Sequence, residues 1–398
     1  MKKFGLSRYT LDHFFAQVVS IHATRPALAL IGETPFSYAE FGRRVQSLIS
    51  LLQAMGIKKQ DRIILLGNSC PNWAIAFLSI MTYGAVAVPI LEDFPESDID
   101  HIIKHSDAVG IFISESLYQS LNLPAMDTLS TVICINDLSV LRGGEKNRSG
   151  LWNQLQSIPE KLKKTLDKSS HSDSYDEIRE DDPAEILYTS GTTGHSKGVM
   201  LTHRNLVSNL FEGPDLLKVI DNQSVVLSIL PLAHAFGSTS ALLSIIYCGA
   251  AIYYLNKPPS PKILTAALQQ VKPTILGAVP LVFEKIYHKQ VAPVIAQKKV
   301  FQWLCKMKPT KRLLYRLIGR KVYRALGGRL KCVIIGGACL SPEVEAFLKD
   351  GRIPYCLGYG LSECSPLVTF SSMQTQKPGS PGHAISDTHL KIVEPEIR

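Results

Sequence analysis

The sequence lacks several patterns that would place it in a specialised class. None of its eight cysteines forms a Cys-x-x-Cys pair, so neither a zinc knuckle nor a redox dithiol is indicated. Only 19% of the 398 residues are charged and 45% are hydrophobic, which excludes disorder, collagen and coiled coil. Lys2 and Lys3 lead into polar-interrupted sequence rather than an apolar run. No secretory signal is therefore indicated, and we expect a cytoplasmic protein.

Acidic residues are missing from one stretch, residues 298–331, which contains twelve Lys or Arg. The formal net charge of +9 depends on this stretch, because the rest of the chain carries slightly more acidic than basic residues. A single basic segment indicates a local anionic partner. It does not indicate nucleic-acid binding, for which no motif is present.

Residues 222–256 contain no Asp, Glu, Lys or Arg and are long enough to suggest a membrane span. Pro231 and the pair Cys248-Gly249 interrupt the run, however. We therefore expect a buried strand, a short helix over Ser238 to Tyr247, and a second strand.

Short apolar runs recur with helical stretches between them, which is typical of strands buried in parallel sheets. These runs are 62–66, 85–90, 109–113, 131–135, 225–229, 252–255, 275–279 and 332–335. The fold class is therefore predicted to be α/β. A polar stretch over 142–182 predicts a linker between two packed lobes, about 1–170 and 180–375, and residues 376–398 resemble the start of a small, truncated β unit.

The loop over residues 189–197 has a composition that indicates a binding site for phosphate groups. A strand-like lead over 186–188 enters a run of Thr, Ser and Gly residues from Thr189 to Gly194, and Lys197 follows. Backbone N–H groups, hydroxyls and one cation suit a polyphosphate. A Walker A loop would require Gly before the Lys and Ser or Thr after it, whereas Ser196 and Gly198 flank this Lys. The loop is therefore of another phosphate-binding class.

The segment YTSGTTGHSKGVMLTHRN (188–205) resembles the signature of the AMP-forming, adenylate-forming enzymes. Three further segments resemble the family's later motifs in the family's order: LPLAHAFG (230–237), IIGGACLSPE (334–343) and GYGLSECSP (358–366). Within the superfamily, the segment 271–287 and the opening stretch look most like long-chain fatty-acid:CoA ligases.

This resemblance implies an adenylation domain over 1–398, made of two packed α/β subdomains with parallel-type sheets and the beginning of a β-barrel. It implies that a fatty acid and ATP form acyl-AMP, and that coenzyme A then accepts the acyl group. The family's pattern continues past Arg398, so we expect the C-terminal domain to be absent and full turnover to be impaired.

The resemblance also implies roles for particular residues. Lys197, Ser362 and His234 would be catalytic, and Glu363 with Thr189 would hold Mg²⁺. Ser362 stands where the family usually has Thr. The nucleotide would be bound by Thr189, Ser190, Gly191, Thr192, Thr193, Gly194, Lys197, Gly336, Gly337, Ala338, Tyr359, Gly360 and Ser362.

The basic stretch predicts a helix from Lys311 to Leu326. Arg312, Arg316, Arg320 and Arg324 recur every four residues, and an apolar side is formed by Leu313, Leu314, Leu317, Ile318, Val322 and Ala325. Such a helix suits an anionic lipid surface at the inner face of the membrane. A solvated or protein-packed basic helix is the alternative.

Two other functions remain open on the sequence. A ligase of the same mechanism could load acyl carrier protein instead of coenzyme A. A truncated product without turnover could still bind nucleotide or lipid. The sequence does not choose among these readings, nor does it set the acyl chain length or the oligomeric state.

Overall fold

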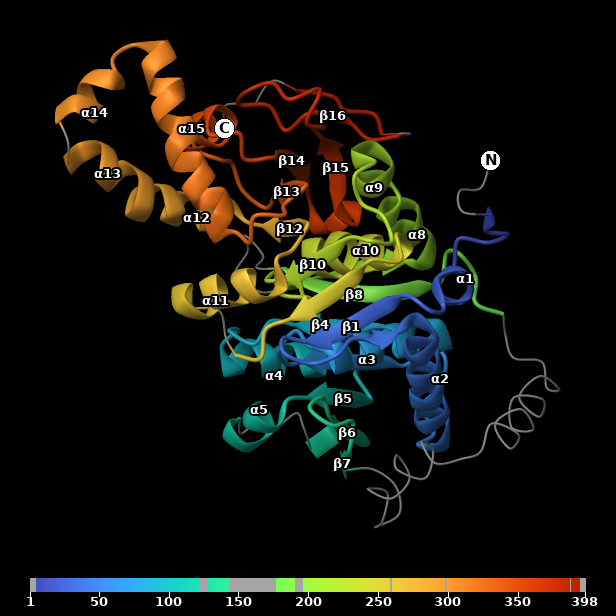
Figure 1. The fold of residues 1–398 in the computed structure, drawn as a ribbon. Helices are drawn as coiled ribbons and strands as arrows, with labels where there is room; N and C mark the ends of the chain where they lie inside the picture. The colour runs from blue at the N-terminus through green and yellow to red at the C-terminus, as the bar shows by residue number, and fades with distance from the viewer. Residues whose placement is uncertain are drawn as a thin grey trace.

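The protein folds around two β-sheets, as a computed structural model of the chain shows (Figure 1). The structure describes residues 5–121, 127–142, 177–189, 196–257, 260–297, 299–386 and 388–393. Both sheets consist mainly of parallel strands covered by helices, which confirms the predicted α/β class and its two subdomains.

The first sheet has seven strands in the order β7-β6-β5-β3-β4-β8-β9. Its strands are β3 (Arg62–Leu66), β4 (Val86–Ile90), β5 (Gly110–Ile113), β6 (Thr131–Cys134), β7 (Val140–Arg142), β8 (Pro183–Thr189) and β9 (Lys197–Thr202). Its central strands are buried along their length, which explains why they are continuous apolar runs in the sequence. The β8–β9 pair is antiparallel and forms one edge.

The second sheet has nine strands in the order β16-β15-β14-β13-β12-β10-β11-β1-β2. Its strands are β1 (Pro26–Leu30), β2 (Phe36–Ser37), β10 (Val225–Ser228), β11 (Ala251–Tyr254), β12 (Ile275–Ala278), β13 (Cys332–Ile335), β14 (Tyr355–Gly360), β15 (Leu367–Phe370) and β16 (His383–Ala384). β14 to β16 are antiparallel, and the described residues contain no closed barrel.

Each sheet contains strands from before and after the polar stretch 142–182. Most of that stretch lies outside the described residues. β1 and β2 precede that stretch but join the second sheet, whereas β8 and β9 follow it and complete the first. Sheet membership therefore does not follow the linear division expected at about residues 170–180, because these strands pair with partners distant in sequence.

Helices cover the sheets on both sides (Figure 1). They are α1 (Leu11–His22), α2 (Tyr38–Ala54), α3 (Pro71–Tyr83), α4 (Glu96–His105), α5 (Glu115–Ser120), α8 (His203–Leu210), α9 (Glu212–Leu217), α10 (Ser244–Tyr247), α11 (Pro261–Val271), α12 (Pro280–Ile286), α13 (Ala292–Gln297), α14 (Lys299–Leu304), α15 (Lys308–Ala325) and α16 (Pro342–Asp350). Two π-helices, η3 (Phe236–Leu243) and η4 (Tyr287–Val291), and a short 3₁₀ helix, η5 (Ser362–Cys364), complete the set. α13 and α14 project from the body beside α15.

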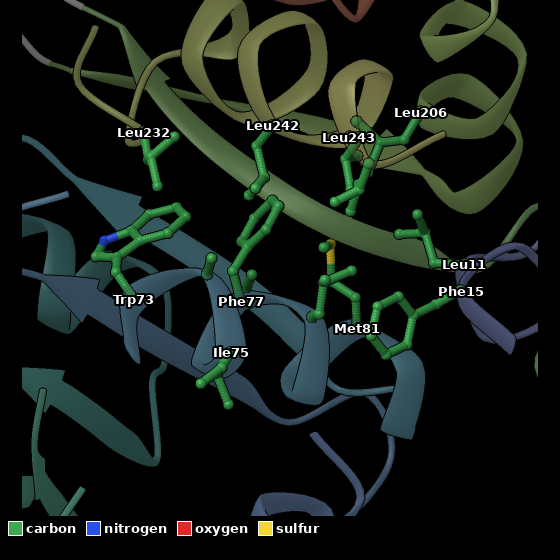
Figure 2. Packing of buried hydrophobic residues seen from close by; sticks show 14 of the residues in the cluster. Leu11, Phe15, Trp73, Ile75, Phe77, Met81, Leu206, Leu232, Leu242 and Leu243 are labelled. Atoms are coloured by element: carbon green, nitrogen blue, oxygen red, sulfur yellow. The ribbon is translucent and has the colours of Figure 1, made fainter. Parts of the chain in front are cut away.

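Helix α3 lies in the largest core cluster (Figure 2). It contacts β3 and β4 of the first sheet and β1 of the second, so it packs between the two sheets. Pro71 begins the helix, the Cys70 side chain accepts a hydrogen bond from the Trp73 N–H, and Gly84 ends it at a φ of 91°. Trp73 and Phe77 stack with ring centroids 5.0 Å apart and face side chains of the segment 232–243. Truncating such a ring to Ala typically costs about 3–5 kcal/mol.

Two predicted helices differ from those observed. The segment expected as one helix over Ser238 to Tyr247 is a π-helix followed by α10. The basic helix runs from Lys308 to Ala325 rather than from Lys311 to Leu326, because Pro309 falls in its first turn. Leu313 and Leu317 were expected on its apolar side, but they are 59% and 53% exposed. The part of the chain that the structure describes has no helix long and apolar enough to cross a membrane.

Candidate functional site

Three of the four sequence motifs meet around one cavity of about 350 Å³. It lies beyond the carboxyl ends of β10, β12, β13 and β14, where ligands of parallel sheets are usually bound. The motif residues in its wall include His234, Phe236, Gly336, Gly337, Tyr359, Gly360 and Ser362. Tertiary folding thus brings together segments that are more than 100 residues apart.

Close backbone packing shapes this cavity. A Cβ on Gly237 would lie 2.0 Å from the Pro231 carbonyl oxygen, and a Cβ on Gly360 would lie 2.0 Å from that of Pro366. Gly337 has a φ of 87°, which favours glycine. One glycine in each of the LPLAHAFG, IIGG and GYGLSE segments is therefore required for the backbone to fold this tightly: Gly237, Gly337 and Gly360.

His234 stands at the start of the turn that enters η3. The Leu232 N–H donates to the Ser69 hydroxyl at 3.0 Å, which fixes this turn to the loop after β3. Burial lowers the pKa of His234 below its ordinary value, while the negative charge of Asp93 opposes the shift. This shift favours the neutral imidazole, which can accept or donate a hydrogen bond beside the cavity.

Tyr359 is 47% exposed, so its ring is accessible to a planar ligand. Gly336 lies against the Gly358 carbonyl and the Phe236 ring, since an added Cβ would approach them to 3.2 and 3.4 Å. Ala338 is exposed in the same turn but is not part of the cavity wall. This side of the cavity is open to a flat aromatic group.

The β8–β9 hairpin holds the two ends of the predicted phosphate loop. Thr189 pairs directly with Lys197, and Lys197 is exposed. The remaining predicted residues of the loop, Ser190, Gly191, Thr192, Thr193 and Gly194, lie outside the described residues. Neither Thr189 nor Lys197 is among the residues that line the 350 Å³ cavity.

Glu363 lies in η5, which packs against β9. Its side chain is exposed and lines a second cavity of about 480 Å³. The structure records no ion pair between Glu363 and any described basic residue, and the described residues contain no cluster of three His, Cys, Asp or Glu that could hold a metal alone. An acid of this kind fits Mg²⁺ only if phosphate oxygens supply other ligands.

Asn209 is a residue of this site that the sequence reasoning missed. Its side chain is nearly buried and lies between the two cavities, contributing to both walls. Its amide donates to the Cys364 and Leu367 carbonyls at 3.2 and 2.9 Å. The signal that could have revealed it is a polar residue on the face that α8 buries through Leu206 and Leu210.

Comparisons with known proteins agree with this architecture. Residues 15–398 match the family described as AMP-binding enzyme. Long chain acyl-CoA synthetase 3 of Arabidopsis thaliana is 29% identical over 89% of this chain and 56% of its own length. Long-chain-fatty-acid–CoA ligase FadD15 of Mycobacterium bovis is 27% identical over 91% of this chain and 61% of its own length.

A third relative is the chloroplastic long-chain-fatty-acid–[acyl-carrier-protein] ligase AEE15 of Arabidopsis thaliana. It is 27% identical over 90% of this chain and 56% of its own length. The chain thus spans somewhat more than half the length of these relatives.

Solved structures show the same fold at low identity. The anthranilate CoA ligase AuaEII in complex with anthranoyl-AMP has a TM-score of 0.74 and is 17% identical, over all of this chain and 67% of the other. ATP-bound MatB from Rhodopseudomonas palustris has a TM-score of 0.72 and is 19% identical, over 97% of this chain and 67% of the other. With a family match over nearly its whole length and the motif segments gathered at one sheet edge, the chain belongs to the AMP-binding enzymes.

Proposed function

We propose that this chain binds Mg-ATP and a long-chain fatty acid and serves the formation of acyl-AMP. In that reaction a carboxylate oxygen attacks the α-phosphorus of ATP and pyrophosphate leaves; the thiol of coenzyme A then displaces AMP from the acyl carbon. The cavity that joins His234, Gly336 and Tyr359 is the observation that carries the proposal.

Each predicted residue has a task in this proposal. Two anions must approach each other, so neutralising their charge is the main requirement. Lys197 would contact the β- and γ-phosphates together with the loop 190–194, and Tyr359 would stack on adenine against the turn 336–338. The hydroxyl of Ser362 and the neutral imidazole of His234 would donate hydrogen bonds to the carboxylate or α-phosphate.

Glu363 and the Thr189 hydroxyl would hold Mg²⁺ with the nucleotide's phosphates. When bound, the ion would neutralise the phosphate charge that develops as pyrophosphate leaves. The exposed carboxylate in η5, next to β9, supports this assignment.

Calorimetric titration with Mg-ATP tests the proposal. Lys197→Ala and Glu363→Ala should each weaken binding about tenfold or more, as expected for one charge-assisted contact. Lys262→Ala, which removes a lysine of α11 outside the motifs, is the control. Equal affinity in all four proteins would refute the nucleotide site.

The acyl acceptor is either coenzyme A or acyl carrier protein, since relatives named for each are similar to this chain. We propose coenzyme A, because two of the three relatives described above are named as CoA ligases or synthetases. Incubating the protein with palmitate, ATP and each acceptor in turn discriminates between them. Product with acyl carrier protein alone would reverse our assignment.

We also propose that α14 and α15 contact an anionic lipid surface. Five apolar side chains are exposed there amid the basic residues: Val300, Trp303, Met307, Leu313 and Leu317. Basic residues near an anionic membrane contribute about 1 kcal/mol each. Leu317→Ser should reduce co-sedimentation with anionic vesicles, whereas Leu281→Ser, equally exposed at 53% on α12, should not. Equal binding by both variants would reject the contact.

A further inference from the structure

A third cavity, which is strongly basic, lies at the opposite end of the second sheet's parallel strands from the 350 Å³ cavity. It measures about 400 Å³ and is lined by Arg316, Arg320, Tyr323, Arg324, Gly328, Gly351 and Arg352. Gly328 and Gly351 precede β13 and β14, whereas the first cavity lies beyond the carboxyl ends of the same strands. The two cavities are therefore separate.

Tight helix packing builds this cavity. An added Cβ on Gly319 would lie 2.4 Å from the Gly351 carbonyl oxygen, so α15 and the end of α16 touch through their backbones. Arg316 and Arg320 lie on either side of Gly319, and Arg352 follows Gly351. The contact thus brings arginines from two separate segments to one place.

The backbone of Arg352 adopts a strained conformation at the edge of this cavity. Its φ is 56°, in the left-handed region that is unfavourable for a non-glycine residue. The C-terminal end of α15 is fixed as well, because the Gln269 side chain donates to the Arg324 and Ala325 carbonyls at 2.7 and 2.8 Å. The arginines therefore project from a rigid frame rather than from a loose tail.

None of the acids that the structure describes neutralises these four arginines. The lining residues include no Asp or Glu, and the structure records no ion pair between the four arginines and any described acid. The nearest acid in sequence, Asp350, is paired with Arg312 at 3.3 Å, one turn before Arg316. The four arginine side chains are exposed, so the cavity presents a concentration of positive charge that an anion in solution can reach.

We infer that this cavity binds a phosphate monoester dianion. Guanidinium forks match phosphate oxygens in pairs, and arginine is favoured where such recognition matters. The phosphate could belong to a soluble metabolite or to the headgroup of an anionic lipid, because the contacts are the same. The inference does not depend on the proposed nucleotide chemistry, which uses other residues.

The experiment compares two probes and one matched control. Glycerol 3-phosphate is titrated by calorimetry, and co-sedimentation is measured with phosphatidylcholine vesicles with and without phosphatidic acid. The double variant Arg316→Gln/Arg320→Gln should weaken binding of at least one probe tenfold or more. Arg312→Gln removes a charge from the same helix but from outside the cavity. It should therefore retain binding of glycerol 3-phosphate and weaken vesicle binding only about fivefold, as expected for one basic residue near an anionic surface.

Each outcome bears on the inference. Loss with the soluble probe assigns a metabolite, and loss confined to phosphatidic acid assigns a lipid headgroup. Equal behaviour of the double variant and Arg312→Gln with both probes overturns the site. If the double variant does not fold, Arg352→Gly replaces it: glycine relieves the positive φ, so the fold should be kept while binding falls. Unchanged binding in a folded Arg352→Gly protein likewise overturns the site.

Discussion

The side chain of Asn209 exchanges two hydrogen bonds with the backbone of Leu367. Its amide donates to the Leu367 carbonyl at 2.9 Å, and its carbonyl oxygen accepts from the Leu367 N–H at 3.1 Å. A third bond reaches the Cys364 carbonyl. Because α8 follows directly from β9, this clamp connects the strand that begins at Lys197 to the segment that carries Glu363.

Asn209→Ala should therefore both destabilise the protein and loosen the site. Three bonds are lost and buried backbone groups are left without partners, so we expect a loss of about 2–4 kcal/mol in the free energy of unfolding. Urea denaturation measures it. Asn209→Asp keeps the acceptor for Leu367 but loses the two donations, so it should be intermediate; a harmless Ala variant would show that the clamp contributes nothing.

Gly237→Ala should displace the turn that carries His234. The new Cβ would overlap the Pro231 carbonyl oxygen, which belongs to the backbone and cannot rotate away. We expect a destabilisation of about 1–3 kcal/mol and weaker nucleotide binding. Gly213→Ala is the matched control, since Gly213 lines the same cavity but has open space where its Cβ would lie. Similar melting temperatures for both variants would contradict this account.

Glu185 should make the protein less stable as the pH rises. Its carboxylate is fully buried, and burial raises its pKa from 4.5 to about 8, while the nearby Ser238 hydroxyl opposes the shift. Between these values the unfolded chain releases a proton that the folded chain keeps, so stability falls, by on the order of 4 kcal/mol by pH 8. Glu185→Gln should remove this slope in urea titrations at pH 5.5 and 8. A slope that persists in the variant must come from other groups.

His203 should make the protein less stable as the pH falls, the opposite direction to the effect of Glu185. Its imidazole is buried and accepts the Leu11 N–H at 3.2 Å, and burial lowers its pKa from 6.5 to about 4. Unfolding then takes up a proton between these values, so stability falls as the pH drops from about 6.5 to 4, by about 3 kcal/mol. His203→Asn should reduce the fall in melting temperature between pH 6.5 and 4. If the variant's melting temperature falls as much as that of the wild type, carboxylates rather than His203 cause the fall.

Local sequence determined much of the fold. The apolar runs at 62–66 and 332–335 are strands with the predicted bounds, because a strand buried on both faces must be continuously apolar. The motif glycines could also be read from the sequence, because few other residues permit close backbone contact. The π-helical turn and the exposure of Leu313 could not, because both depend on the partner that each helix face meets.

By itself, then, the sequence determined the α/β class and the eight apolar strands at the centres of the two sheets. Only the tertiary structure decided which sheet each strand joins, that Asn209 lies between two cavities, and that Arg352 lies beside Arg316 and Arg320. The physical reason is that hydrophobic patterning and turn chemistry act over a few residues and are written locally. Contacts between distant segments depend on how the elements pack, and no local pattern encodes that packing.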